Sequence, residues 1–120
     1  MVDFDTKATL LKSLVGDFFT IILTEPPDPN NNGINVQDFI RDGLTYIPFF
    51  SSPDALKEST KGIDFGKLQY QIDKRLFTEM LYPEQLFVFN PDLPSETVLT
   101  GEEIKKIFPE PFPWNELLKQ

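Results

Sequence analysis

The sequence predicts an α+β fold, a small mixed β-sheet of three to five strands flanked by helices. Segments with apolar residues at helical spacing alternate along the chain with short β-branched or aromatic runs, a pattern typical of helices packed on a sheet. The chain has 120 residues, which corresponds to one domain. Twelve residues are phenylalanine, and such large side chains let a small domain bury a core without disulfides or metals.

The first part of the chain predicts a helix, a strand, a loop and a helical turn. Residues 6–15 are expected to be helical, because leucine and valine recur at helical spacing before Gly16, which stops the helix. Residues 18–24 are β-branched and aromatic, which favours a buried strand, and two prolines end it. After a Pro/Asp/Asn/Gly loop at 25–34, a short helical turn is expected at 36–42.

The middle of the chain predicts a second strand and two helices. The strand is 44–50, and Pro48 within it is expected to face an edge, a bulge or a loop, because proline has no N–H to donate. A cap at Ser52 opens a helix at about 53–59. Residues 66–81 are expected to form the longest helix. The apolar stripe behind this expectation is Phe65, Leu68, Ile72, Leu76, Phe77 and Met80.

The last part predicts a strand at 85–90, too apolar on both sides to be exposed, and a short strand at 97–99. Thr100 and Glu103 have the spacing of a capping box, which opens a helix at 101–107. The pattern does not predict the order of the strands in the sheet.

The amino-acid composition excludes most kinds of catalytic site. The chain contains no histidine and no cysteine, which excludes Ser-His-Asp and Cys-His arrangements and zinc held by imidazole or thiolate. No Gly-x-Gly-x-x-Gly or Walker-type phosphate loop is present. Carboxylate chemistry remains, but Glu102 and Glu103 are adjacent and point in different directions on a helix. We therefore expect a protein that is not an enzyme and that uses no cofactor.

The net charge indicates which classes of partner the chain is not expected to bind. The formal net charge is −8, whereas nucleic acids and anionic membranes are bound through basic patches, so neither is an expected partner. The segment from 79 to 110 is rich in glutamate and contains only two lysines. Such a segment is either a solvated acidic surface or a surface that recruits a basic partner.

Location and metal binding follow from local patterns. The first five residues lack the basic start of a secretory signal, no stretch approaches the ~20 apolar residues of a membrane span, and cysteine is absent, so a cytoplasmic location is expected. The loop Asp28–Gly33 resembles the start of a calcium loop, but Phe39 stands where a bidentate glutamate should close it. No metal site is expected.

The C-terminal residues form a distinct segment. We divide the chain into a domain at 1–108 and a Pro/aromatic tail at 109–120 that packs on the domain. The candidate contacts for an unknown protein partner are Phe112, Trp114 and Leu117, because aromatic residues beside prolines often anchor interfaces. The alternative is that the tail only covers its own domain.

A second candidate site lies where strands 44–50 and 85–90 end. Ser51, Ser52 and Asn90 offer hydroxyls, an amide and a helix start, which suit a small polar metabolite. The simpler interpretation is structural: Ser52 caps its own helix and Asn90 satisfies the turn.

Three segments together resemble a known family: Gly43–Leu56, Gln85–Asp92 and Leu99–Ile104. Their order and spacing are similar to those of the SseB N-terminal domain family, named for enhanced serine sensitivity and distinct from the secreted translocon protein of the same name. The resemblance covers roughly residues 8–108, and full-length family members carry a second, C-terminal domain. It implies a bacterial cytoplasmic protein of α+β fold and supplies no catalytic residues.

Two functions are therefore expected from the sequence. The leading hypothesis is a non-catalytic protein-interaction module, and the alternative is a small-metabolite-binding domain.

Overall fold

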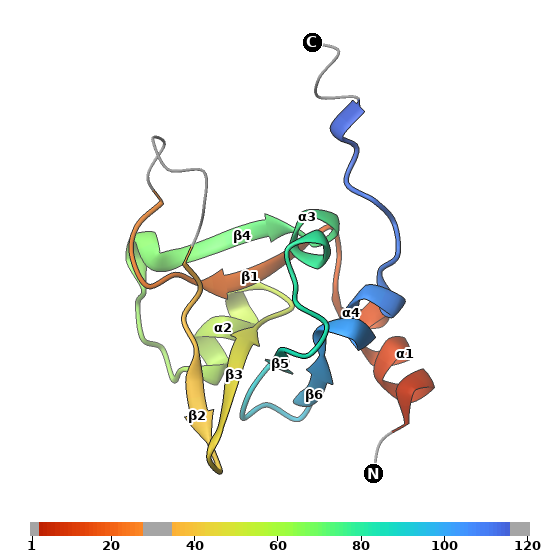
Figure 1. Ribbon diagram of the computed structural model, residues 1–120. Coiled ribbons are helices and arrows are strands. Elements are labelled where there is room, and N and C mark those ends of the chain that lie inside the picture. Colours follow the sequence, from red (N-terminus) through yellow and green to blue (C-terminus); the bar gives the residue numbers. More distant parts are fainter. Residues whose placement is uncertain (1–2, 28–34, 116–120) are drawn as a thin grey trace.

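The computed structural model describes residues 3–27 and 35–115, and in this part of the chain helices and strands build a mixed α+β fold (Figure 1). The predicted fold class is confirmed. The elements in chain order are α1 (Phe4–Leu14), β1 (Phe18–Ile22), β2 (Phe39–Arg41), β3 (Leu44–Phe49), α2 (Pro53–Ser59), the 3₁₀ helix η1 (Gly66–Leu68), β4 (Gln69–Asp73), α3 (Lys74–Glu79), β5 (Leu86–Phe89), β6 (Thr97–Thr100) and α4 (Gly101–Ile107).

The strands form two sheets. The larger has the order β2-β3-β5-β6, with β3 and β5 parallel and the other pairs antiparallel, so it is mixed as predicted. The smaller is the antiparallel pair β1-β4. Thr20 of β1 and Phe50 exchange two backbone hydrogen bonds of 2.8 and 2.9 Å, which join the two sheets just beyond the end of β3.

Phenylalanine rings form the centre of the main core. Phe19 of β1 meets Phe49 of β3 edge to face at a centroid distance of 5.0 Å and Phe77 of α3 at 5.1 Å. Phe87 and Phe89 of β5 pack on Phe49 from the neighbouring strand. These rings place β1, β3, β5 and α3 around one core. Buried aromatic pairs add about 0.5–1.5 kcal/mol each beyond the area they bury.

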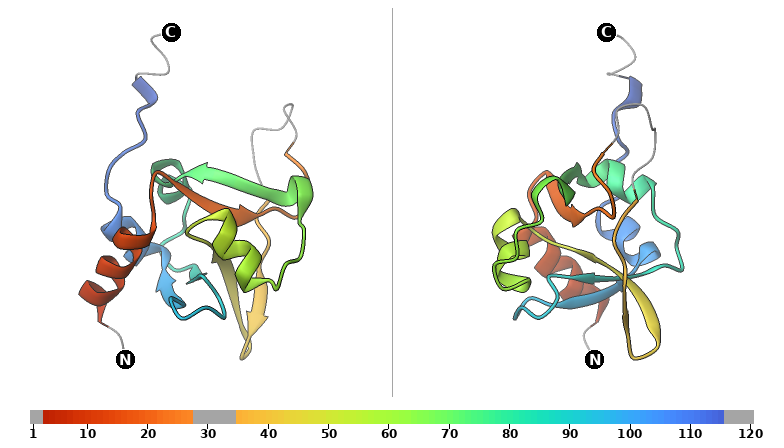
Figure 2. Two further views of the ribbon diagram at one scale, coloured as in Figure 1. Left: turned by 180° about the vertical axis from the view of Figure 1, so that it is seen from behind. Right: turned by 90° about the vertical axis from the view of Figure 1, so that its left-hand side faces the viewer.

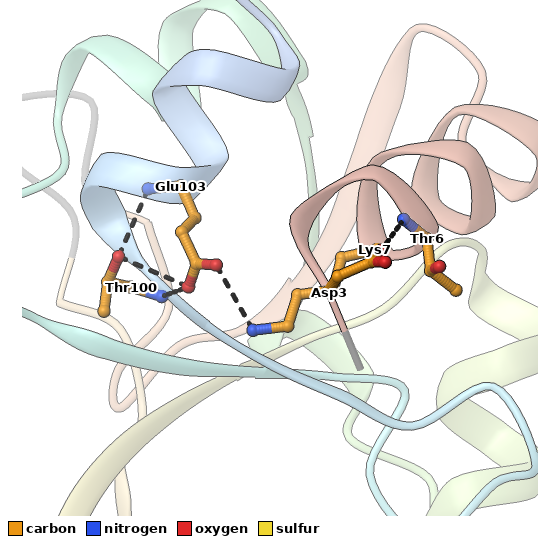
Figure 3. A network of polar contacts seen from close by, with 5 residues as sticks. All are labelled: Asp3, Thr6, Lys7, Thr100 and Glu103. Carbon is orange, nitrogen blue, oxygen red and sulfur yellow. Dashed lines mark hydrogen bonds and ion pairs between the residues drawn. The ribbon is translucent and has the colours of Figure 1, made fainter. Parts of the chain in front are cut away.

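Helices α1 and α4 lie side by side and belong to the same core, whereas α2 covers a smaller cluster with Phe50 (Figure 2). Glu103 links the first pair. Its backbone N–H donates to the Thr100 hydroxyl, its carboxylate accepts from the Thr100 backbone N–H, and the Lys7 ammonium of α1 lies 3.2 Å from its other oxygen (Figure 3). Figure 3 also shows Asp3 capping α1 through the backbone N–H of Thr6. The predicted helix at 101–107 and its capping box are confirmed.

The long helix predicted at 66–81 is wrong. The segment is instead η1, strand β4 and the short helix α3. Tyr70 and Ile72 alternate with polar residues, which is strand periodicity, and Ile72 pairs with Phe19 of β1. Asp73 then ends the strand and caps α3 by accepting from the backbone N–H of Arg75.

The helical turn predicted at 36–42 is also wrong. Residues Phe39–Arg41 form the edge strand β2, which pairs with β3 across a two-residue turn. That turn is Asp42-Gly43, with φ of 53° and 78°, the left-handed backbone that an Asp-Gly hairpin turn requires. The strand boundaries predicted at 44–50, 85–90 and 97–99 agree with β3, β5 and β6 within a residue.

Pro48 lies in the interior strand β3. The pairing of β3 with β2 ends at Tyr46, and the Phe49 carbonyl accepts from Asn90 on the β5 side. Because successive backbone groups of a strand point to opposite sides, the Pro48 nitrogen faces the gap beyond the end of β2. The expectation of an unpaired position is met locally, although the strand is not an edge strand.

Two further observations bear on function. None of the helices in residues 3–27 and 35–115 is both long and apolar enough to cross a membrane. Over the same residues, no three acidic side chains gather in a way that could hold a metal ion. The loop Asp28–Gly33 lies outside the described residues.

Candidate functional site

Glu79 holds the described part of the tail at the end of α3. Glu79 accepts two hydrogen bonds, one per carboxylate oxygen: from the Phe112 backbone N–H at 2.9 Å and from the Trp114 indole N–H at 2.8 Å. The Phe112 and Trp114 rings meet edge to face, with centroids 4.7 Å apart. The structure therefore brings two of the three predicted contact residues together, whereas Leu117 lies outside the described residues.

Arg75 supports this arrangement from one turn earlier in α3. Its guanidinium lies 5.7 Å from the Phe112 ring centroid. It also forms a two-pronged pair with Asp73, at 3.0 Å from Nε and 2.9 Å from Nη2. The hydrogen bond from Arg75 is the main reason that the pKa of Asp73 lies below its usual value, although partial burial opposes the shift. The pairing with Asp73 thus fixes the Arg75 guanidinium next to the Phe112 ring of the tail.

Large apolar side chains remain exposed around this point. Trp114 is 48% exposed although its indole N–H is held, Met80 at the end of α3 is 46% exposed, and Tyr82 is 76% exposed. Beyond α4 the tail runs past α3 and away from the sheets, in each view of Figures 1 and 2. Half-exposed aromatic side chains whose polar group is already hydrogen-bonded are the kind that anchor protein interfaces.

A cavity of about 280 Å³ opens beside the same helix end. It lies between the end of α3, the first residues of β5, the middle of β3 and the residues before β2. The described side chains that line it are uncharged: they are Asn35, Val36, Ile47, Phe77, Met80, Leu81, Tyr82, Gln85 and Phe87. Consecutive residues serve the tail and the cavity, since Glu79 holds the tail and Met80 lines the cavity.

The second predicted site is an internal hydrogen-bond network. Asn90 is buried, and its side-chain oxygen accepts from the Ser51 backbone N–H at 3.0 Å. Its amide group donates to the hydroxyls of Ser51 at 3.1 Å and Ser95 at 3.0 Å. Ser52 accepts from the Ala55 backbone N–H and caps α2. The structure brings these residues together, but their hydrogen-bonding groups bind one another.

The remaining carboxylates near α4 also have structural partners. Glu103 is held in the capping box and by Lys7, and Glu102 pairs with Lys106 at 3.3 Å, one turn along the helix. Across the described residues, every buried side-chain nitrogen or oxygen has a hydrogen-bond partner. No orphaned buried polar group marks a reaction centre there.

Sequence reasoning missed Glu79, Met80 and Tyr82. The predicted helix ran through 81, which placed Met80 on a buried stripe and left Glu79 as an ordinary surface acid. A signal was present, since Met80, Leu81 and Tyr82 are three successive large apolar residues before a proline. A helix that buries one stripe cannot bury three successive residues, so part of this run had to be exposed.

Comparisons with known proteins place the chain in a family. The model of the SseB protein N-terminal domain matches residues 4–106. Neither the curated proteins nor the solved structures contain a match. The matched range includes every helix and strand from α1 to β6 and ends inside α4, so the family pattern spans the fold described above. The chain belongs to the SseB protein N-terminal domain family.

Proposed function

We propose that this chain is a non-catalytic protein-interaction module that contacts its partner through the end of α3 and the tail. The observation that carries the proposal is Trp114, which is fixed by its bond to Glu79 and yet is 48% exposed. Met80, the residue after Glu79, lines an apolar cavity. A side chain already held in place loses little entropy on binding, which favours its use as an anchor. The family resemblance supports a bacterial cytoplasmic setting for this interaction.

The composition supports the non-catalytic part of the proposal. The chain has no histidine and no cysteine, so a reaction would depend on carboxylates, hydroxyls or lysine amines. The adjacent carboxylates of Glu102 and Glu103 are both engaged in holding α4. Binding of a small metabolite at Ser51, Ser52 and Asn90 has less support, because those side chains already satisfy one another or cap α2.

The proposal is tested by affinity capture from the native cell lysate, with the full chain as bait at low and moderate salt. We expect a reproducible partner that Trp114→Ala no longer captures. Ile40→Ala is the matched control, since Ile40 is 74% exposed on β2 and removed from the tail, and it should capture normally. Equal capture by the Trp114 variant, or no capture by the wild type at either salt, would contradict the proposal.

Deleting residues 109–120 tests whether the tail is a contact element or part of the core. The described tail is attached by two hydrogen bonds to an exposed carboxylate and by partly exposed rings. We therefore expect the deletion to abolish capture and to leave the thermal midpoint close to that of the full chain. A large fall in the midpoint would show that the tail is core.

A further inference from the structure

The cavity beside α3 has the size of a side-chain pocket. Its volume of about 280 Å³ lies just below the roughly 300–1,000 Å³ typical of pockets for small-molecule ligands. Its walls are mostly apolar, and Met80 and Tyr82 are exposed at its mouth. Resting on the proposed function, we propose that this cavity receives a bulky apolar side chain, a leucine or phenylalanine, from a basic segment of the partner protein.

Three glutamates that contact or directly precede residues of the cavity lining favour a basic partner. Glu25 accepts a hydrogen bond of 2.7 Å from the side chain of Asn35, which lines the cavity. Glu79 directly precedes Met80, and Glu84 directly precedes Gln85, both of which also line it. All three glutamates are exposed. The described donors to Glu79, a backbone amide and an indole, are neutral.

The cavity wall does not offset the negative charge of these glutamates. Among the described residues that line it there is neither lysine nor arginine. Helix α3 carries two cations, both at its start: Arg75, whose charge is matched by Asp73 at 2.9 Å, and Lys74, which lies over the Phe108 ring. With a formal net charge of −8 for the chain, lysines or arginines that flank the inserted side chain meet a complementary surface. A second copy of this chain would bring the same excess of negative charge to the interface, which disfavours it as the occupant.

The chain carries two probes suited to a direct test. It has a single tryptophan, Trp114 in the tail, and two methionines, Met1 and Met80, of which Met80 lines the cavity. The ¹³C-methyl signal of Met80 reports on the cavity, and the fluorescence of Trp114 reports on the tail. The two can therefore be followed separately during one titration.

The experiment titrates the full chain with three short synthetic peptides. The first has a central leucine and phenylalanine flanked by lysines, the second replaces the lysines by glutamate, and the third replaces the two apolar residues by serine. We expect only the first to shift the Met80 methyl signal to saturation, with an affinity that falls as salt is raised. Equal binding of the second or third peptide, or binding without a Met80 shift, overturns the proposal.

Variants sharpen the assignment. Met80→Lys places a cation at the cavity mouth, and Glu84→Lys reverses a rim charge at an exposed position that does not endanger folding. We expect each to weaken binding of the first peptide, by about tenfold or more for Met80→Lys. The matched control is Ile63→Lys, at a 59% exposed apolar residue after α2, which should bind as the wild type does. If neither site variant weakens binding, the proposal is wrong.

Two outcomes separate this inference from the proposed function. If no peptide shifts Met80 while Trp114→Ala still abolishes partner capture, the cavity assignment fails and the interaction module stands. If partner capture also fails, both fail. Removal of residues 116–120 tests the remaining occupant: a shifted Met80 signal before any peptide is added would show that the chain fills its own cavity, and would overturn the proposal.

Discussion

Two regions of this domain use their side chains in opposite ways. Where β3 and β5 end, Asn90 is 2% exposed and its amide group is bonded to both Ser51 and Ser95. At the end of α3, Met80 and Tyr82 leave apolar surface in solvent beside a cavity. The polar side chains of the first region bind one another, which makes it a closed region, whereas the apolar side chains of the second region are open to solvent. The polar residues at the strand ends therefore hold the fold, whereas the end of α3 leaves apolar surface uncovered.

The difference has an energetic basis. A buried amide that loses its hydrogen-bond partners costs about 1–3 kcal/mol. Breaking the hydrogen bonds of Asn90 is therefore unfavourable, and the network stays closed. Exposed apolar surface has the opposite tendency, because covering it with a partner is favourable by about 25 cal/mol per Å². Four predictions test this contrast, from the largest expected effect to the smallest.

Gly101→Ala should be the most destabilising. Gly101 opens α4, and a Cβ there would overlap the backbone carbonyl of Tyr82, which cannot yield as a side chain would. We expect the free energy of unfolding to fall by about 3 kcal/mol or more, against the gain of up to ~1 kcal/mol that alanine otherwise brings to a helix. Denaturant unfolding measures the change.

Gly16→Ala is the control for that substitution. A Cβ at Gly16 meets nothing within 4 Å, so this variant should unfold within about 1 kcal/mol of the wild type. If Gly101→Ala is as stable as Gly16→Ala, the segment at Tyr82 that borders the cavity is not packed as described.

Asn90→Ala should destabilise the closed region. The change leaves the Ser51 backbone N–H and two hydroxyls without their partner, and it places alanine at a φ of 47°. We expect a loss of about 2–3 kcal/mol, read as a lower thermal midpoint, with binding by the folded protein unchanged. Gln71→Ala, at an exposed residue of β4, should leave the midpoint in place. A ligand site at Asn90 would show the reverse pattern: lost binding with little loss of stability.

Glu103→Gln should reduce the acid sensitivity of the domain. Burial opposes ionisation of Glu103, but the Thr100 backbone N–H and the Lys7 ammonium outweigh it, and together they hold the pKa of Glu103 below its ordinary value of 4.5. A carboxyl whose pKa is lowered by folding stabilises the folded state above the unfolded pKa. That contribution disappears as pH falls below about 4.5 and through the folded pKa.

The variant should therefore lose about 1 kcal/mol at neutral pH and very little at acid pH, so that the two unfolding curves converge. Glu102→Gln, which alters only an exposed pair within α4, is the control. Curves that stay parallel from neutral pH to well below 4.5 would contradict the role assigned to Glu103.

Glu79→Ala should have the smallest effect on stability and a clear effect on the tail. It removes the acceptor of the Trp114 indole N–H, so we expect red-shifted emission and lower fluorescence anisotropy from this single tryptophan. The thermal midpoint should change little, because both bonds lie at the surface. Glu84→Ala, at a nearby exposed glutamate, should leave the emission unchanged. Unchanged emission from the Glu79 variant would mean that the tail is not held there.

Local signals explain which elements the sequence could predict. The cap at Ser52 and the capping box of Thr100 and Glu103 act within one helical turn, and both helices begin where they were expected. Strand β4 could not be predicted in this way. Its apolar residues fit a helical stripe as well as strand alternation, and the choice is made by pairing with β1, which is distant in sequence.

The same limit applies to the candidate site. The proximity of Phe112 to Trp114 follows from their spacing, but their anchor, Glu79, is 33 and 35 residues away and was visible only in the fold. The cavity joins residues from four separate segments, so no sequence window contains it. For the polar residues at the strand ends, the simpler interpretation from the sequence, a cap at Ser52 and a turn satisfied by Asn90, agrees with the structure, and the fold adds Ser51 and Ser95 as the partners of Asn90.

The most direct test of the account is a paired measurement of thermal midpoint and partner capture for Met80→Lys and Ser95→Ala. We expect opposite losses. The Met80 variant should keep its thermal midpoint and no longer capture the partner. The Ser95 variant, which removes one acceptor from the hydrogen-bond network of Asn90, should have a lower thermal midpoint and still capture the partner at temperatures below its unfolding transition. A Ser95 variant that loses capture while still folded, or a Met80 variant that captures normally, would contradict it.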